Sequence, residues 1–183
     1  MKLLRFAVLY TALALGANPA LGSDLAALRD GTMQKLIFHD APQQTPPVNV
    51  TTRGGAAVEL ADYRGKIVLV NFWATYCAPC RTEMPSLDAL QAELGGDDFD
   101  VVTIATGPNK MAAIDRFFSE RDIENLPILL DPRSKAARSM GVMALPISVL
   151  LDRDGQEIAR LIGDADWHSD SARAIVSTLI AGH

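Results

Sequence analysis

Two cysteines, Cys77 and Cys80, are the residues of this sequence best suited to chemistry. They are the chain's two cysteines, separated by Ala78 and Pro79. A disulfide between them would close a loop too short to constrain the unfolded chain much, so it would add little stability. Such a pair is better explained by reactivity, because it can cycle between dithiol and disulfide. The sequence therefore favours a redox-active pair over a structural disulfide.

The flanking residues place this pair between a strand and a helix. Residues 67–73 form a nearly continuous apolar run, typical of a strand buried on both faces. A helix is expected over 79–94, with apolar residues on one face and a proline at its start. The free N–H groups and dipole of a helix N-terminus lower a cysteine pKa from about 8.5 to about 3.5–7.5. Cys77 is therefore expected to attack, and Cys80, one turn further, to resolve.

The rest of the chain predicts a mixed α/β sheet with helices on both faces. Residues 23–47 lack a clear pattern and are expected to be a lead-in, with a short helix over 24–29 and an extended connector over 41–47. The expected domain covers 48–183. After a hairpin over 48–60, further strands are expected over 99–105, 128–130, 146–151 and 157–162, and helices over 110–120, 134–140 and 166–181.

The first 22 residues have the layout of a secretory signal peptide. A basic start with Lys2 and Arg5 precedes an uncharged stretch over 6–17, and Ala20-Leu21-Gly22 offers small residues for cleavage. The apolar region of a signal peptide runs about 7–15 residues, whereas a membrane-spanning helix needs about 20. The sequence predicts export to a bacterial periplasm, with an uncleaved membrane tether as the alternative.

Composition excludes several classes of protein. With 17 Lys+Arg against 22 Asp+Glu, the net charge of −5 argues against a nucleic-acid binder. Two cysteines exclude a disulfide-rich framework and a zinc site built from three or four cysteines. A two-thiolate copper or zinc site stays open as an alternative, but none of the three histidines, His39, His168 and His183, adjoins the pair. No metal and no cofactor are expected.

The sequence resembles the thioredoxin superfamily, and more narrowly the TlpA/ResA/CcmG-like exported thiol–disulfide oxidoreductases, the TlpA group most of all. The resemblance covers 48–183 and implies a thioredoxin fold with an N-terminal β-hairpin extension and a central insert. It rests on the stretches LADYRGK over 60–66, VNFWATYCAPCRTEMP over 70–85, Gly141-Val142, Leu145-Pro146 and DRDG over 152–155.

The resemblance also implies roles for residues near the cysteines. Glu83 would accept and return the proton of Cys80. The alternative is that Glu83 is only an acidic residue in the first turns of the helix, where it interacts favourably with the helix dipole. Pro146 would follow a cis peptide bond in a loop that faces the cysteines. The backbone of Leu145 could then pair with an extended substrate segment. Trp73 would pack the core and shield the disulfide.

Two positions depart from the family pattern. Tyr76 stands where a second Trp is usual, and Ile147 follows Pro146 where Thr is usual. Tyr76, Ala78 and Pro79 would border the substrate. These departures concern the redox potential and the choice of partner rather than the type of reaction.

The function that the resemblance implies is reduction of disulfides in periplasmic partner proteins by a monomeric enzyme. The partners would be apocytochrome c or the proteins that deliver copper to cytochrome oxidase. A membrane electron donor of the CcdA/DsbD type would re-reduce the Cys77–Cys80 disulfide. Two alternatives stay open: an oxidant that donates its disulfide, and a module that binds copper through the thiols.

Overall fold

The computed structural model of the chain describes residues 24–182, and the expected leader over 1–22 lies outside them. The strands are β1 (Leu36–Gln43), β2 (Asn49–Thr52), β3 (Ala57–Glu59), β4 (Ile67–Trp73), β5 (Phe99–Thr106), β6 (Leu129–Asp131), β7 (Ile147–Leu151) and β8 (Glu157–Ile162). The helices are α2 (Ala78–Leu94), α3 (Met111–Glu120), α4 (Lys135–Ser139) and α5 (Asp170–Ala181), with 3₁₀ turns η1 (Gly31–Lys35) and η2 (Leu60–Tyr63). Within the described range no helix is long and apolar enough to cross a bilayer.

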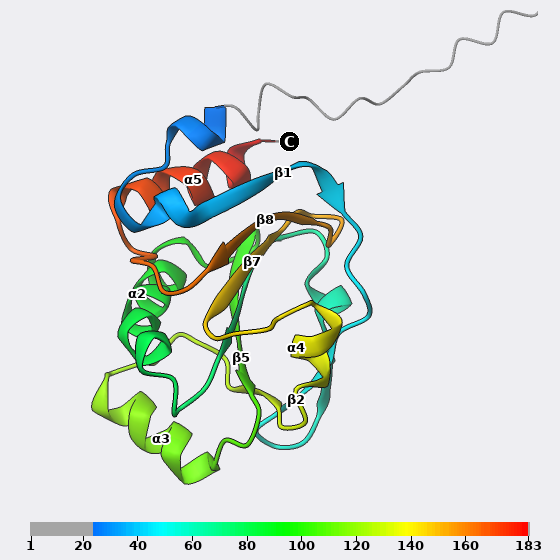
Figure 1. The fold of residues 1–183 in the computed structure, drawn as a ribbon, viewed down its shortest axis with the longest axis vertical. Coiled ribbons are helices and arrows are strands. Elements are labelled where there is room, and N and C mark those ends of the chain that lie inside the picture. Colours follow the sequence, from blue (N-terminus) through cyan, green and yellow to red (C-terminus); the bar gives the residue numbers. More distant parts are fainter. Residues whose placement is uncertain (1–23, 183) are drawn as a thin grey trace, which may run out of the picture.

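In the described chain the strands form one mixed sheet in the order β1-β8-β7-β4-β5-β6-β2-β3 (Figure 1). All seven residues of β4 are buried, because β4 pairs with β5 and β7 and each of its faces meets a hydrophobic core. One core packs α2, α3 and α5 against the sheet, and the second packs α4 and η2 against the opposite face. The expected α/β fold with helices on both faces is confirmed.

The N-terminal hairpin and the central insert are both present. β2 and β3 pair antiparallel, with Val50 opposite Val58. Between β5 and β7 the chain adds α3, β6 and α4, and β6 receives the hairpin through the pairing of Thr51 with Leu130. The hairpin therefore extends the sheet at one edge, away from the cysteines' strand β4.

Strand β1 is the main difference from the expected lead-in over 23–47. It pairs antiparallel with β8, with Leu36 opposite Leu161, and forms the other edge of the sheet. Only Leu36 in β1 is fully buried, the large apolar residues stop at Phe38, and Pro42 lies within the strand, so the residue pattern over 36–43 does not predict a strand. A proline is tolerated on an edge strand because no neighbour needs its missing N–H. Backbone pairing, rather than apolar burial, defines this strand.

The start of the described chain lies beside α5. The Ser171 hydroxyl of α5 donates to the carbonyl of Leu28, and the backbone N–H of Asp30 donates to the same hydroxyl. Figure 1 shows the start of the described chain, the dark blue helical turn, near α5 at the top of the molecule, whereas β5 leads toward α3 at the bottom and β4 runs parallel to β5. The chain therefore enters the domain at the end opposite the one where β4 leads into the cysteines.

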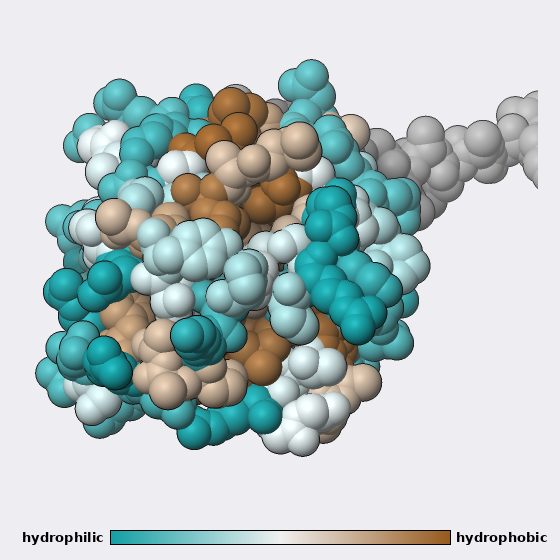
Figure 2. All heavy atoms as spheres, turned by 60° about the horizontal axis from the view of Figure 1, so that its bottom comes forward, coloured by the Kyte–Doolittle hydropathy of each residue, from teal (hydrophilic) through white to brown (hydrophobic). Residues whose placement is uncertain are grey.

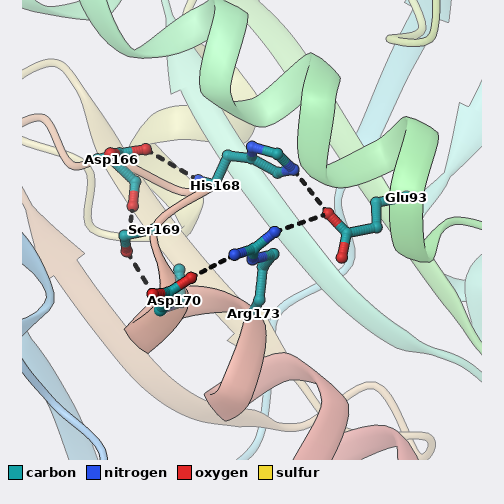
Figure 3. Close-up of polar contacts among 7 residues, drawn as sticks. Glu93, Asp166, His168, Ser169, Asp170 and Arg173 are labelled. Carbon is teal, nitrogen blue, oxygen red and sulfur yellow. Dashed lines mark hydrogen bonds and ion pairs between the residues drawn. The ribbon is translucent and has the colours of Figure 1, made fainter.

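A polar cluster fixes the start of α5 against α2 (Figure 3). Glu93 of α2 accepts from His168 at 2.7 Å and from Arg173 at 3.3 Å, and Arg173 also pairs with Asp170. The Ser169 side chain caps the helix, so α5 begins at Asp170, four residues later than expected. The cluster is exposed, so it orients the helix without forming part of the core.

Candidate active site

Cys77 and Cys80 form a disulfide where β4 leads into α2. Cys77 is the N-cap of α2, and its sulfur accepts a hydrogen bond from the Cys80 N–H at 3.2 Å. Cys77 is partly exposed, whereas Cys80 is completely buried. Because of this difference in exposure, an incoming disulfide can reach Cys77 but not Cys80. The helix N-terminus also stabilises a thiolate at Cys77.

The residues beside the disulfide divide into exposed and buried sets. Ala78 and Pro79 are exposed, and 63% of the Tyr76 surface is accessible. Trp73 is buried instead, with its ring 5.5 Å from Phe117 and 5.9 Å from the neighbouring Phe118 of α3. Trp73 therefore packs the core that also contains Cys80, and its role as a shield for the disulfide stays a prediction.

Glu83 lies one turn after Cys80 and is buried, with 2% of its surface accessible. Its Oε1 accepts from Asn71 Nδ2 at 2.8 Å, and its Oε2 accepts from the Ala165 N–H at 3.1 Å. Burial raises the pKa of Glu83 to about 7, because these hydrogen bonds only partly offset the lost hydration and the negative charge of Asp164 adds to the effect. The carboxyl can therefore gain or lose a proton near neutral pH.

Two residues that sequence reasoning missed complete this buried network. Asn71 of β4 and Ser148 of β7 are both fully buried, and Asn71 Nδ2 donates to Ser148 Oγ at 2.9 Å. One signal was present in the sequence, because Asn71 is the polar residue within the apolar run 67–73. Ser148 gave no signal, since its contact with Asn71 depends on the pairing of β4 with β7.

The loop before β7 lies next to the cysteine segment. The Leu145–Pro146 peptide bond is cis. Ile147 pairs with Phe72 of β4. Pro146, the residue before Ile147, therefore lies beside the end of β4, next to the segment that leads to Cys77. Leu145 is partly buried and packs against both cores. The structure thus brings Pro146 and Leu145 to the end of the sheet that carries the disulfide.

The loop after β5 holds the segment before Cys77 in place. Asn109 Oδ1 accepts from both the N–H and the hydroxyl of Thr75, at 2.8 and 2.9 Å. The Tyr76 hydroxyl donates to the Thr106 carbonyl at 3.4 Å. Gly107 allows this contact, because a Cβ there would lie 2.8 Å from the Tyr76 oxygen. These contacts fix the approach to the disulfide.

Apolar side chains are exposed at the end of the domain where β4 and β5 finish. Figure 2 brings this end forward and shows apolar residues, in brown, gathered above the centre of the face, with hydrophilic residues, in teal, around much of it. Exposed apolar side chains near the cysteine and Pro146 segments include Tyr76, Met143, which is 90% accessible, and Ile162, which is 62% accessible. Ile162 pairs with Ile147, the residue after Pro146.

The histidines considered as metal ligands have other partners. His39 contacts Glu157 at 2.9 Å and His168 contacts Glu93 at 2.7 Å, whereas His183 is not among the described residues. Over residues 24–182 no group of three or more His, Cys, Asp or Glu side chains is placed to hold a metal ion.

Comparison with known proteins identifies the family to which the chain is similar. The Redoxin family matches residues 40–176. Thiol-disulfide oxidoreductase ResA of Bacillus cereus is 30% identical over 137 residues, which are 75% of this chain and 78% of ResA. The thioredoxin-like protein YneN of Bacillus subtilis is 39% identical over 114 residues, 62% of this chain and 66% of YneN.

Solved structures agree with these relatives. A crystal structure of a protein described as thiol:disulfide interchange protein DsbE, from Chlorobium tepidum, matches with a TM-score of 0.67 and 25% identity, over 76% of this chain and 96% of that one. The fold, the strand–CxxC–helix geometry and these relatives agree with one another. The chain therefore belongs to the Redoxin family of the thioredoxin superfamily, as a ResA-like thiol–disulfide oxidoreductase.

Proposed function

We propose that this oxidoreductase acts mainly as a reductase of disulfides in exported partner proteins, with Cys77 as the attacking and Cys80 as the resolving sulfur. The observation that carries the proposal is the difference between the two sulfurs. Cys77 is partly exposed at the N-cap of α2, whereas Cys80 is completely buried on the same helix, one turn before Glu83. Only the outer sulfur can meet a protein disulfide without a change in the fold.

The reaction then proceeds in two exchanges. The Cys77 thiolate attacks one sulfur of the partner disulfide, a Cys77–partner disulfide forms, and the other partner sulfur leaves as a thiolate. Cys80 next gives its proton to the Glu83 carboxylate and attacks Cys77. The Cys77–Cys80 disulfide forms, the second partner sulfur leaves as a thiolate, and Glu83 or water returns a proton to it. The partner gains two electrons, which the two cysteines lose.

Glu83 suits this role because of where its pKa lies. A proton acceptor works best when its pKa is close to the operating pH. Burial brings the Glu83 pKa to about 7, so the ionised form that accepts the Cys80 proton and the protonated form that returns it are both accessible. An exposed glutamate with an ordinary pKa would be a weaker base and would accept the Cys80 proton poorly.

The apolar face around the disulfide supports a protein substrate rather than a small one. Tyr76, Met143 and Ile162 expose large apolar side chains near Cys77 and Pro146. Apolar surface of this kind is stabilised when a partner covers it. A partner segment that lies along the Leu145 backbone would cover part of this face while its disulfide reaches Cys77.

The cellular setting follows from the leader and the direction of the reaction. An exported reductase must be re-reduced, so we place a membrane electron donor of the CcdA/DsbD type upstream of the enzyme. We place apocytochrome c or copper-delivery proteins of cytochrome oxidase downstream. The enzyme would work as a monomer in the periplasm, released from its leader over 1–22 or tethered by it.

The test separates the two sulfurs. Cys80→Ser should accumulate a covalent complex with its partner through Cys77, and Cys77→Ser should accumulate almost none. The assay is a non-reducing gel of periplasmic extract for each variant, with added reductant collapsing the band. Equal trapping by both variants, or trapping by Cys77→Ser alone, would show that the sulfur roles are wrong.

The reduction potential decides the direction of transfer. A value near about −270 mV is that of thioredoxin, and a value near about −120 mV is that of a strong oxidant. We expect the Cys77–Cys80 couple near the first value. A potential near the second would make the protein a disulfide donor, and stoichiometric copper retained through gel filtration would instead make it a metal-binding module.

A further inference from the structure

Asn71 is a polar residue in a strand whose other residues are apolar. The other six residues of β4 are apolar, and all seven are buried. A buried amide needs hydrogen-bond partners for its nitrogen and its oxygen, and an unpartnered polar atom costs stability. The Oδ1 atom of Asn71 is buried without a partner. A leucine of similar size would pack at this position without that cost, so the amide points to a function other than stability.

The contacts of the amide nitrogen indicate what that function is. An amide –NH₂ group has two hydrogens to donate. One goes to Oε1 of Glu83 at 2.8 Å and the other to Oγ of Ser148 at 2.9 Å. Both donors are therefore used, and the second contact sets the rotation of the amide so that the first points at the carboxylate. Ser148 lies on β7, so Asn71 ties Glu83 to two neighbouring strands.

We propose that Asn71, oriented by Ser148, is a positioning residue that fixes the direction of the Glu83 carboxylate and sets how tightly it holds a proton. This inference rests on the proposed role of Glu83 as the proton acceptor of Cys80. A hydrogen bond donated to a carboxylate favours its ionised form, and the ionised form is the one that can take the Cys80 proton.

The other groups facing Glu83 leave this task to Asn71. Ala165 donates a backbone N–H, which no side-chain change removes. Asp164, in the same loop, is a negative charge that favours the protonated form, and its carboxylate lies 3.7 Å from Lys35. The Trp167 indole also faces the carboxylate, although its Nε1 has no hydrogen-bond partner of regular geometry.

The remaining neighbours do not change this conclusion. Cys80 shares helix α2 with Glu83 and is the group that the carboxylate would serve. The contacts from β4 and β7 are Asn71 and Ser148, which do not titrate. Asn71 is therefore the side chain with a regular hydrogen bond that opposes burial and Asp164, and its loss should raise the pH at which Glu83 ionises.

The experiment follows the pH dependence of the second exchange. A mixed disulfide between Cys77 and a small thiol is prepared, and its resolution by Cys80 is timed from pH 5 to 9. In Asn71→Leu we expect the midpoint to move upward by about one pH unit, and the rate at pH 7 to fall about fivefold. Ser148→Ala should move the midpoint the same way by less, and it tests the inference independently if Asn71→Leu fails to fold.

A matched control is available on the neighbouring strand. Thr103 lies opposite Asn71 on β5, is fully buried and donates to the Pro127 carbonyl at 2.7 Å. Thr103→Val removes a buried hydrogen bond of comparable depth but should leave the midpoint where it is. A general loss of stability would affect both variants alike, whereas a positioning role affects only Asn71→Leu.

The Glu83→Gln background separates this inference from the proposed function. There, Asn71→Leu should cause no further change in the pH profile. If Asn71→Leu and Ser148→Ala both keep the wild-type midpoint while Glu83→Gln alters it, the inference is wrong and the proposed function stands. If Glu83→Gln itself leaves the profile unchanged, Glu83 does not handle the proton, and both ideas fail at that step.

Discussion

The carboxylate of Glu157 on β8 lies 2.9 Å from the Nε2 atom of His39 on β1, and this contact joins the edge strand to the rest of the sheet. Arg160 holds the same carboxylate through two nitrogens at 2.8 and 2.7 Å, and it also donates to the Met140 carbonyl after α4. Burial works against ionisation of Glu157, but the hydrogen bonds from Arg160 and His39 outweigh it and hold the pKa below its usual range.

The first prediction concerns stability in acid. A carboxyl whose pKa is lowered by folding stabilises the native state above its unfolded-state pKa, and this contribution is lost as the pH falls through the native pKa. Glu157→Gln should therefore lower the free energy of unfolding at pH 7 by about 1–3 kcal/mol, and by progressively less as the pH falls below the unfolded-state pKa of about 4.3. Urea unfolding at pH 7 and pH 3.5 measures the difference.

An exposed carboxylate is the control for Glu157. Glu93 also pairs with a histidine and an arginine (Figure 3), but it lies on the surface, and exposed ion pairs contribute about 0–1 kcal/mol. Glu93→Gln should change stability within that range. An equal loss for Glu157→Gln at both pH values would mean that this side chain acts through packing and not through its charge.

The second prediction has the opposite sign and concerns Glu83. Its pKa is raised by burial from 4.5 to about 7, so between these values the native protein binds more protons than the unfolded chain. Stability should then fall as the pH rises through this window. At about 1.4 kcal/mol per pKa unit, the fall amounts to about 3 kcal/mol.

Glu83→Gln removes that dependence. We expect the oxidised wild-type protein to be less stable at pH 8 than at pH 5, and the variant to show little change between them. The oxidised form is used because disulfide-bonded cysteines do not titrate. Guanidinium unfolding at the two pH values provides the measurement, and the same decline in the variant would assign the effect to another group.

The third prediction concerns Gly107, which has a φ of +81°. A side chain costs about 1–2 kcal/mol in this region, so Gly107→Ala should lower Tm by about 3–6 °C. The new methyl would also crowd the Tyr76 hydroxyl, 2.8 Å away. Because Tyr76 is exposed and can turn aside, we expect most of the loss to persist in a Tyr76→Ala background. Disappearance of the loss there would assign it to the ring instead of the backbone.

The fourth prediction concerns the apolar face near the disulfide. If a protein partner covers this face, Met143→Lys and Ile162→Lys should each lower kcat/KM for a protein disulfide by about tenfold, which corresponds to about 1.4 kcal/mol. Reduction of a small aromatic disulfide should stay the same, because it does not reach these side chains. Leu28→Lys is the control, since Leu28 is also exposed but lies beside α5. Equal effects on both substrates would rule out a docking role.

The elements defined by apolar pattern could be predicted from sequence. β4 occupies the same residues as the expected strand, 67–73, because an unbroken apolar run needs burial on both faces. The position of the cysteines follows, since the chain leaves β4 and enters α2 within a few residues. The position of Glu83 one turn after Cys80 could also be predicted from its spacing on the helix, whereas its role as a proton acceptor stays a prediction.

The parts that depend on pairing across the sheet could not. β1 is held by backbone hydrogen bonds to β8 and by the contact of His39 with Glu157, neither of which leaves a pattern in the residues 36–43. The contact between Asn71 and Ser148 joins residues 77 positions apart. No local rule connects them, because the register of β4 with β7 brings them together.

The entry of the chain beside α5 has a consequence for orientation. The start of the described chain, the dark blue helical turn beside α5, and the α3 end of the sheet, where β5 and the parallel strand β4 finish, lie at opposite ends of the domain (Figure 1). A domain fixed to any surface through residue 24 would therefore carry its disulfide on the outward pole, facing bulk solvent. Large folded partners could then approach Cys77 without meeting that surface, and the domain could rotate about its attachment point without hiding the disulfide.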